Sequence, residues 1–232
     1  MTDDDFEWAA GLMEQRRARY EQYSPVFWRP AREVTAQHAA FMRAMASQPG
    51  AVALRSAHGF LVSGLQENRC LVDDFAVDAD QHWITEGREL LLAAWAQRSP
   101  EQSVLRVVTA RQDLPKRELL EDLGLIVTAR WWVKELAPAE SASVYGEVDL
   151  GSATGLFVPA PPVYDPGGPV CLLGDIDASL AGDLAEEAER QGAVLAVIDR
   201  SPQTAATNEP ALERHGFHNP SEFFEGTASS DS

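Results

Sequence analysis

The sequence predicts an α/β fold: a mixed, twisted sheet flanked by helices, in a tandem arrangement with a shortened C-terminal repeat. Residues 70–97 give the first indication, because a strand-like run is followed by a loop and then by apolar residues at helical spacing. A second apolar strand follows this helix, which is typical of parallel strands joined by a helical crossover. The same order of elements then begins again near residue 170.

The first half contains two helices, a strand meander and a strand–helix series. Apolar periodicity predicts the helices, and short links between the first three strands predict antiparallel neighbours. The strand after the crossover helix should lie parallel to the third one. In chain order the expected elements are helices 6–23 and 32–47, strands 51–55, 59–65 and 69–77, a helix from about 88, strand 103–110, helix 114–123 and strand 126–136. Arg16, Arg17 and Arg19 could bind an anion, but they are interpreted as solvated charges of the first helix, which is the more common meaning of such a group.

Composition changes after Leu136 and again near residue 169. Residues 137–168 are rich in Pro, Gly, Ala and Ser, with a strand-like Gly155–Val158, which indicates a linker or a wrapping segment. We therefore predict a first domain at 1–136, a truncated lobe at 169–226 and a disordered tail at 227–232. The lobe should contain strands 170–176, 193–198 and 222–225 and helices 180–191 and 209–215.

The two halves share short sequence matches as well as element order. CLVDDFAVD in the first half matches CLLGDIDAS in the second, and Gly124 and Gly216 each follow the second helix of their series. Glycine in this place is typical of a helix end. These matches predict an internal repeat.

The net charge of −17 argues against binding to nucleic acid or to an anionic membrane surface. The same field favours a cationic substrate such as an amine, although acidity is also a common route to solubility. Cys70 and Cys171 lie in apolar runs and are expected to be buried free thiols. With an acidic N-terminus and no long apolar run, these features predict a cytoplasmic protein. No spacing of His, Cys and carboxylates predicts a metal site.

This order of elements resembles the GCN5-related N-acetyltransferase (GNAT) family over about Phe27 to Leu136. In that family a Gln/Arg-x-x-Gly-x-Gly/Ala loop wraps the coenzyme A pyrophosphate at a helix start, where free N–H groups favour an anion. The matching residues here are HWITEG, in which only Gly87 conforms, while His82 and Thr85 replace the usual Gln or Arg and the first Gly. The family's tyrosine acid is replaced by Leu120, and by Leu212 in the repeat.

The resemblance implies which residues would form the site. Asp73 or Asp74 would take the amine proton, and because neighbours on a strand point to opposite faces, at most one of them faces the cleft. A solvated strand carboxylate is the alternative for both. The residues implied to contact acetyl-CoA are Phe75, Ala76 and Val77 on the strand and His82, Trp83, Thr85, Glu86, Gly87 and Arg88 at the helix start. Gly87→Glu would then abolish coenzyme A binding.

The resemblance thus implies an acyl-CoA-dependent N-acyltransferase that acts on a small amine with acetyl-CoA as co-substrate. The alternative is a non-catalytic protein that uses the same fold to bind a ligand or a protein partner, which the altered loop and the missing tyrosine favour. A homodimer stays open, and a thiol-release assay separates the enzyme from the binding protein.

Overall fold

A computed structural model describes residues 1–137, 145–174 and 176–227, without the side chains of 203–207. The strands form a mixed sheet in the order β1-β2-β3-β4-β10-β5-β9-β8-β7-β6. The chain divides into two compact units, which we describe separately: unit 1 comprises 1–19, 33–128 and 222–232, and unit 2 comprises 20–32 and 129–221. None of the helices among the described residues is long and apolar enough to cross a membrane.

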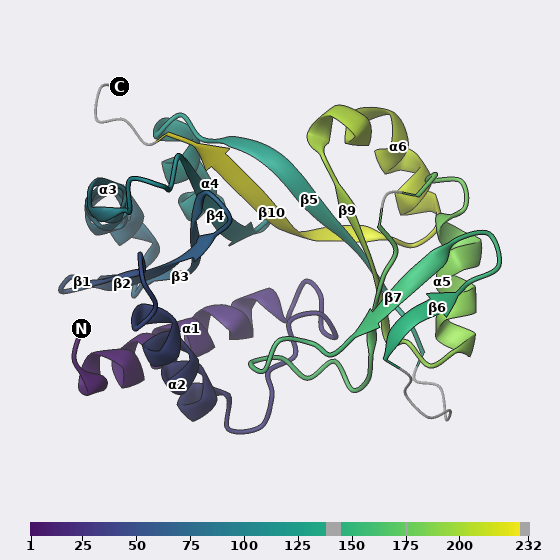
Figure 1. Cartoon of the computed structure of the whole chain (residues 1–232), viewed down its shortest axis with the longest axis horizontal. Coiled ribbons are helices and arrows are strands. Elements are labelled where there is room, and N and C mark those ends of the chain that lie inside the picture. The colour runs from purple at the N-terminus through teal and green to yellow at the C-terminus, as the bar shows by residue number, and fades with distance from the viewer. Residues whose placement is uncertain (138–144, 175, 228–232) are drawn as a thin grey trace. The chain divides into compact units, whose positions relative to one another are not determined.

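Unit 1 contains the predicted meander and crossover (Figure 1). Its elements are α1 (Asp3–Tyr20), α2 (Val34–Ala46), β1 (Val52–Arg55), β2 (Gly59–Gln66), β3 (Arg69–Val77), α3 (Arg88–Gln97), β4 (Val104–Ala110) and α4 (Leu114–Asp122), with parts of β5 (Ile126–Glu135) and β10 (His218–Gly226). β1, β2 and β3 pair antiparallel, and β3 pairs parallel with β4, as the sequence predicted. Gly124 ends α4 with a φ of +76°, a left-handed conformation that favours glycine.

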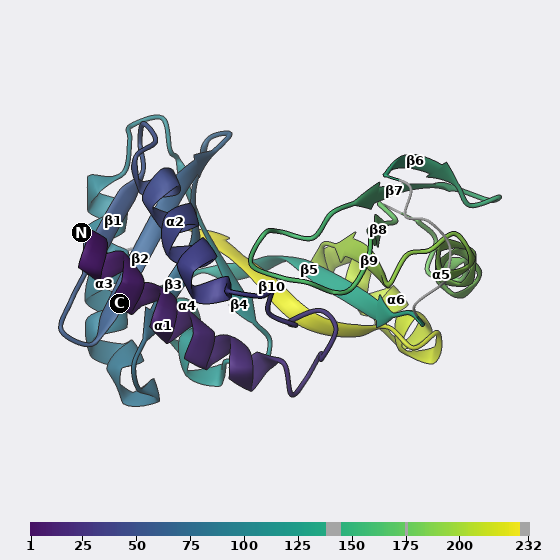
Figure 2. The same ribbon diagram turned by 90° about the horizontal axis from the view of Figure 1, so that it is seen from below.

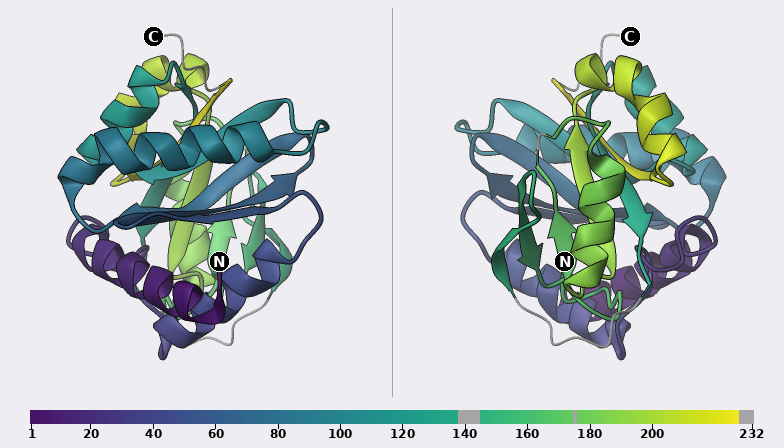
Figure 3. Two further views of the ribbon diagram at one scale, coloured as in Figure 1. Left: turned by 90° about the vertical axis from the view of Figure 1, so that its left-hand side faces the viewer. Right: turned by 90° about the vertical axis from the view of Figure 1, so that its right-hand side faces the viewer.

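Helices cover both faces of the unit 1 sheet. α1 and α2 pack on one face through an apolar cluster that includes Phe6, Met42 and Phe60, and Figure 2 views the unit from this side. α3 and α4 cover the opposite face, as the left view of Figure 3 shows. The cluster beneath them includes Phe75 and Trp83. A sheet buried on both faces explains why β2 and β3 are apolar at most positions and do not alternate with polar residues.

Unit 2 repeats the order strand, helix, strand, helix, strand. Its elements are β6 (Gly146–Asp149), β7 (Thr154–Val158), β8 (Val170–Leu172), α5 (Ala181–Arg190), β9 (Leu195–Arg200) and α6 (Pro202–Arg214), with parts of β5 and β10. α5 lies in front in the right view of Figure 3, and small residues on its inner face, Ala181, Ala185 and Ala188, are fully buried. Gly216 follows α6 at a φ of +82°, as Gly124 follows α4.

Several expectations differ from the structure. The segment 137–168 contains two paired strands, β6 and β7, so its described part is not a plain linker; residues 138–144 lie outside the described range, as do 228–232 of the predicted tail. The boundary between the two compact units does not lie at Leu136, because β5 and β10 each contribute residues to both units. Arg16 and Arg17 are buried, which corrects the interpretation of both as solvated charges.

Candidate active site

The centre of unit 1 is the place where β3 separates from β4. The two strands pair from Arg69–Val104 to Val72–Val107, and β3 then continues to Val77 without this partner. At the same place the register with β2 shifts, so that Val72 and Asp74 face consecutive β2 residues and Asp73 has no partner. A β-bulge of this kind bends a strand and increases its twist. The bulge at Asp73 therefore marks the start of the splay.

Two cations contact the edge of β3 that lies beyond its pairing with β4. Lys116 donates from Nζ to the carbonyl oxygens of Val108 at 2.8 Å and Phe75 at 3.4 Å. Arg16 donates from Nη1 to the carbonyl oxygen of Val77 at 3.1 Å. Both side chains are buried. The edge of the strand that β4 leaves unpaired is thus lined with positive charge, although Phe75, Ala76 and Val77 are themselves buried.

Arg16 has a matched counter-charge. Its guanidinium donates to both oxygens of the Asp113 carboxylate, with Nη2 at 2.7 Å from each and Nε at 3.2 Å from Oδ2. Asp113 is 5 % exposed and immediately precedes α4. Paired contacts of this type fix a guanidinium in orientation as well as in place. The Arg16 guanidinium also lies 4.6 Å from the centre of a Trp83 ring.

Lys116 differs from Arg16 because no carboxylate contacts it directly in the ion pairs of the described residues. Burial lowers its pKa to about 8, a shift that Asp113 opposes and Arg16 reinforces. The ammonium also lies 5.2 Å from the ring centre of Phe75. An amine with this pKa is protonated at pH 7 and can release its proton with little cost.

Asp73 is the solvent-accessible carboxylate of the site. The residue is exposed at the bulge. Neighbouring protein nevertheless desolvates its carboxyl group, and this desolvation, with the charge of Asp74, raises the pKa of Asp73 to about 6; Lys116 opposes the shift. A carboxylate with an accessible side and a pKa near 6 has the properties of a general base at neutral pH.

Asp74 has a different environment. It points toward α1 and α2, where its Oδ1 lies 2.6 Å from Nε2 of His38, and Nδ1 of His38 lies 2.9 Å from Nη1 of Arg17. Because a guanidinium can only donate, Nδ1 of His38 is the acceptor, and its Nε2–H then donates to Asp74. The three side chains, all nearly inaccessible to solvent, form a relay from a cation through a neutral imidazole to a carboxylate. This places Asp73, and not Asp74, where an external ligand can reach it.

The predicted coenzyme A loop is not a loop. A 3₁₀ turn, Asp80–His82, and a π-helical turn, Trp83–Gly87, run directly into α3. The N–H of Trp83 donates to the carbonyl of Asp80, and the N–H of Arg88 donates to those of Trp83 and Thr85. The helical segment thus begins at Asp80, not at Gly87 as the sequence predicted, and the N–H groups at its true start adjoin an acidic residue.

The side chains of this segment face different neighbours. His82 Nδ1 lies 2.6 Å from Oδ1 of Asp78, and Arg88 forms a 3.6 Å ion pair with Asp122. Glu86 accepts hydrogen bonds from the Ser56 hydroxyl and from the His58 N–H; the Ser56 bond is the main cause that lowers the pKa of Glu86.

Trp83 and Gly87 pack against each other inside unit 1. The Trp83 ring is fully buried and meets Phe75 edge-on at 4.8 Å. A Cβ at Gly87 would lie 2.8 Å from Trp83 Cε3, so the absent side chain makes room for this ring. Thr85 and Ile84 are exposed.

Sequence reasoning missed four of these residues: Arg16, Arg17, His38 and Lys116. A lysine one helical turn before Leu120, where the family has its tyrosine, was the available signal for Lys116. The arginines and His38 gave no such signal, because their partners lie far away in the sequence.

No protein-family model and no curated protein matches the sequence. Among solved structures, a "putative acetyltransferase" from Pyrococcus horikoshii matches at 13% identity and a TM-score of 0.56, over 99% of this chain and 88% of that one. Another from Thermoplasma acidophilum matches at 13% identity and a TM-score of 0.50, over 82% of each chain. This chain has the GNAT acetyltransferase fold. A tandem GNAT protein from the clavulanic acid biosynthesis pathway also matches, at 14% identity and a TM-score of 0.39, over 80% of this chain and 86% of that one. At such identities the GNAT fold is shared, and the reaction must be argued from the site.

Acetyl-CoA would need a place for its thioester arm along the splayed strand and a place for its pyrophosphate at the start of the helix. The splayed strand fits the thioester arm, because β3 beyond Val72 has backbone groups that β4 does not pair. The helical turn does not fit the pyrophosphate in the way the sequence suggested, since the Arg88 N–H is bonded within the helix and Gly87 serves the Trp83 ring. The GNAT fold is thus present with a splayed strand, and with a helical turn in place of the loop that the sequence suggested.

Proposed function

We propose that this chain is an N-acyltransferase that takes an acetyl group from acetyl-CoA and transfers it to a small amine. The observation that carries the proposal is the splay of β3 from β4 at Asp73, with an accessible carboxylate at the bulge and a buried ammonium, Lys116, inside the splay. Acetyl-CoA would supply an activated acetyl thioester. The chain's own residues would supply the proton transfers.

Asp73 is proposed as the general base. An amine arrives as an ammonium ion at neutral pH and must lose a proton before it can act as a nucleophile. The Asp73 carboxyl, with its pKa raised to about 6, is ionised at pH 7 and basic enough to accept that proton. The net charge of −17 would favour the approach of such a cation over long range.

Lys116 is proposed as the general acid in place of the family's tyrosine. Its Nζ holds a proton in the splay at pH 7 and, with its pKa lowered to about 8, releases it near the pKa of roughly 8.5 of an ordinary thiol. Near-equal values of this kind are favourable for proton transfer in either direction. Leu120, at the tyrosine position, is buried and apolar.

Phe75, Ala76 and Val77 are proposed to hold the thioester arm through their backbone groups. Lys116 and Arg16 now donate to the carbonyl oxygens of Phe75 and Val77, so they must share or release these contacts when an extended ligand lies along the strand. The 3.4 Å bond to Phe75 is the weaker one and would yield first.

Because the Arg88 N–H is bonded within the helical turn and Gly87 packs against the Trp83 ring, we propose that the thioester arm supplies most of the binding free energy. A matched pair of substrates tests this: S-acetylpantetheine lacks the nucleotide and pyrophosphate of acetyl-CoA. We expect the two substrates to have kcat/KM values within about tenfold of each other. If the nucleotide and pyrophosphate contribute little binding free energy, their removal costs little transition-state stabilisation. The exposed variant Thr85→Glu should change neither value; a selective loss with acetyl-CoA would restore His82, Thr85 and Arg88 as phosphate contacts.

The decisive experiment is thiol release from acetyl-CoA with a panel of small amines. Activity should rise with pH through about 6 as Asp73 ionises and fall above about 8 as Lys116 loses its proton. Asp73→Asn should lower kcat by about 10²–10⁴-fold and remove the acidic limb. Glu118→Gln is the matched control, because Glu118 is an exposed carboxylate on the same helix as Lys116. Equal activity of Asp73→Asn and Glu118→Gln would refute the assignment of the base.

The alternative is a non-catalytic protein with the GNAT fold that binds a ligand or a protein partner. The observation in its favour is that Trp83, Lys116 and Arg16 already occupy the region next to the edge of β3 that β4 leaves unpaired. Absence of thiol release with every amine, together with no calorimetric binding of acetyl-CoA or S-acetylpantetheine, would favour it. We also propose that the protein is cytoplasmic and binds neither nucleic acid nor membranes. Analytical sedimentation tests whether it forms a homodimer.

A further inference from the structure

We propose that His58, Asp78 and His82 form a binding site for a divalent transition-metal cation such as Zn²⁺. The sequence predicted no metal site, because these residues lie far apart or without a recognisable spacing. The structure brings one ligand atom of each within 4.8 Å of the others. This cluster is separate from the proposed acyl-transfer groups, and the inference does not depend on them.

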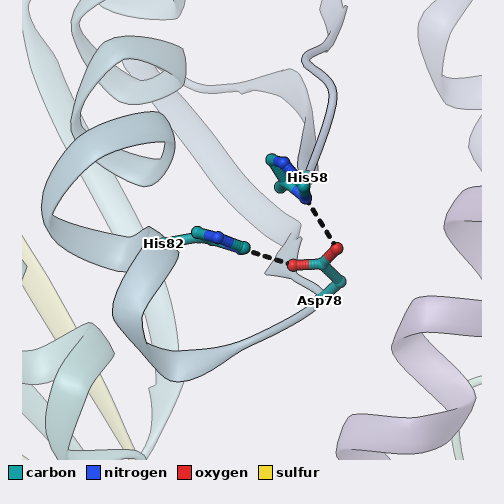
Figure 4. Close-up of side chains that lie close together, drawn as sticks. All are labelled: His58, Asp78 and His82. Atoms are coloured by element: carbon teal, nitrogen blue, oxygen red, sulfur yellow. Dashed lines mark hydrogen bonds and ion pairs between the residues drawn. The ribbon is translucent and has the colours of Figure 1, made fainter.

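The two imidazoles converge on one carboxylate (Figure 4). His58 Nδ1 lies 2.9 Å from Oδ2 of Asp78, and His82 Nδ1 lies 2.6 Å from Oδ1 of the same group. The two ring centres lie 4.1 Å apart, with the ring planes tilted by 31°. Neutral imidazole nitrogens and a carboxylate are the donor set that Zn²⁺ and its neighbours in the first transition series accept.

The spacing suits one bridging ion. Donors at about 2.0–2.1 Å from a tetrahedral Zn²⁺ lie roughly 3.4 Å from each other. The two short nitrogen–oxygen contacts would open by less than about 1 Å, and the other donor pairs, which lie within 4.8 Å, would close by at most about 1.4 Å; side-chain rotations at a surface can supply both changes. The His58, Asp78 and His82 side chains are 45%, 37% and 23% exposed, so an ion can enter from solvent.

The backbone around the three residues is held by other contacts. Asp78 donates its N–H to the carbonyl of His58, and His82 donates its N–H to that of Ala79. Glu86 accepts the His58 N–H at 2.8 Å, and its other oxygen lies 3.8 Å from Nε2 of the same ring. A carboxylate that accepts a hydrogen bond from the outer nitrogen of a ligating histidine fixes the ring and raises its basicity, and Glu86 could do so if this 3.8 Å contact shortened. The site is therefore partly organised before an ion binds.

Three protein ligands would leave at least one position for water, so the site resembles an exchangeable or reactive metal site more than a closed structural one. An ion there would also join the turn between β1 and β2 to the end of β3 and the start of the helical segment. Binding should for this reason stabilise unit 1 against unfolding.

Calorimetric titration of the full chain, free of any histidine tag, with ZnCl₂ tests the proposal. We expect one Zn²⁺ per chain, at least tenfold weaker binding in His82→Ala and Asp78→Asn, and unchanged binding in the control His215→Ala. Zinc at about 100 times the wild-type Kd should raise the Tm of the wild type by roughly 5–11 °C and that of His82→Ala by no more than about half as much. Visible absorption of the Co²⁺ form reports the same ligands independently.

The variants should have the Tm and circular dichroism of the wild type in EDTA, which separates lost ligands from lost folding. If either variant unfolds, the conservative His58→Gln replaces it in the same titration. Absence of Zn²⁺ binding by the wild type, or equal affinity in the wild type and in folded ligand variants, would overturn the proposal.

Discussion

Replacing Asp113 by alanine should destabilise unit 1 by about 3–5 kcal/mol, because it removes the bidentate counter-charge of the buried Arg16 guanidinium, for which the half-exposed Asp80 carboxylate at 3.8 Å compensates poorly. Arg16 is 4 % exposed and makes three contacts of 2.7–3.2 Å to this carboxylate. Proteins of this size unfold with only about 5–15 kcal/mol, so the loss is a large share of the total. At about 2–4 °C per kcal/mol, the expected fall in Tm is roughly 6–20 °C.

Urea unfolding followed by tryptophan fluorescence measures the effect, and Trp83, next to the Arg16 guanidinium, reports locally. Arg19→Ala is the control, because the Arg19–Asp80 pair has a similar 3.0 Å distance but both side chains are about half exposed. Such surface pairs contribute about 0–1 kcal/mol. The double variant Arg16→Met with Asp113→Leu should recover most of the lost stability. A cost for Asp113→Ala as small as that for Arg19→Ala would refute the reasoning.

Three further outcomes can be checked by thermal unfolding and thiol labelling. Gly87→Ala should cost about 1–3 kcal/mol, because its Cβ would lie 2.8 Å from a carbon of the Trp83 ring. Gly11→Ala, in the interior of α1 with no atom within 4 Å of the new Cβ, should stabilise by about 0.5–1 kcal/mol; a lower Tm would contradict this. Cys70 and Cys171 are fully buried and their burial raises both thiol pKa values, so a thiol reagent should label them only in denaturant.

The fold was predictable where the signal is local. Short links between apolar runs set the antiparallel meander of β1, β2 and β3, and the helix after β3 forces a parallel return to β4. Gly124 and Gly216 were read as helix ends, and both adopt the left-handed conformation that this role requires. Each of these inferences depends on residues close together in the chain.

What depends on distant partners was not predictable. Arg17 looks like a surface charge in the sequence, and only the approach of His38 on α2 gives it a buried partner. The insertion of β10 between β4 and β5 is equally invisible, because its C-terminal residues join unit 1 across more than 90 residues of chain. Buried charges therefore mark the limit of pattern reasoning here, since burial of a charge is decided by tertiary pairing.

Gly87 illustrates why one motif residue cannot carry a functional assignment. The sequence suggested that glycine was present so that a pyrophosphate could approach, and that Gly87→Glu would therefore abolish coenzyme A binding. In the structure the space beside Gly87 is filled by Trp83, so any side chain there would disturb the packing next to Phe75 whether or not a phosphate binds. Loss of binding in Gly87→Glu would not distinguish the two explanations. Thr85→Glu adds the same charge at an exposed position, and so it tests the phosphate without disturbing the ring.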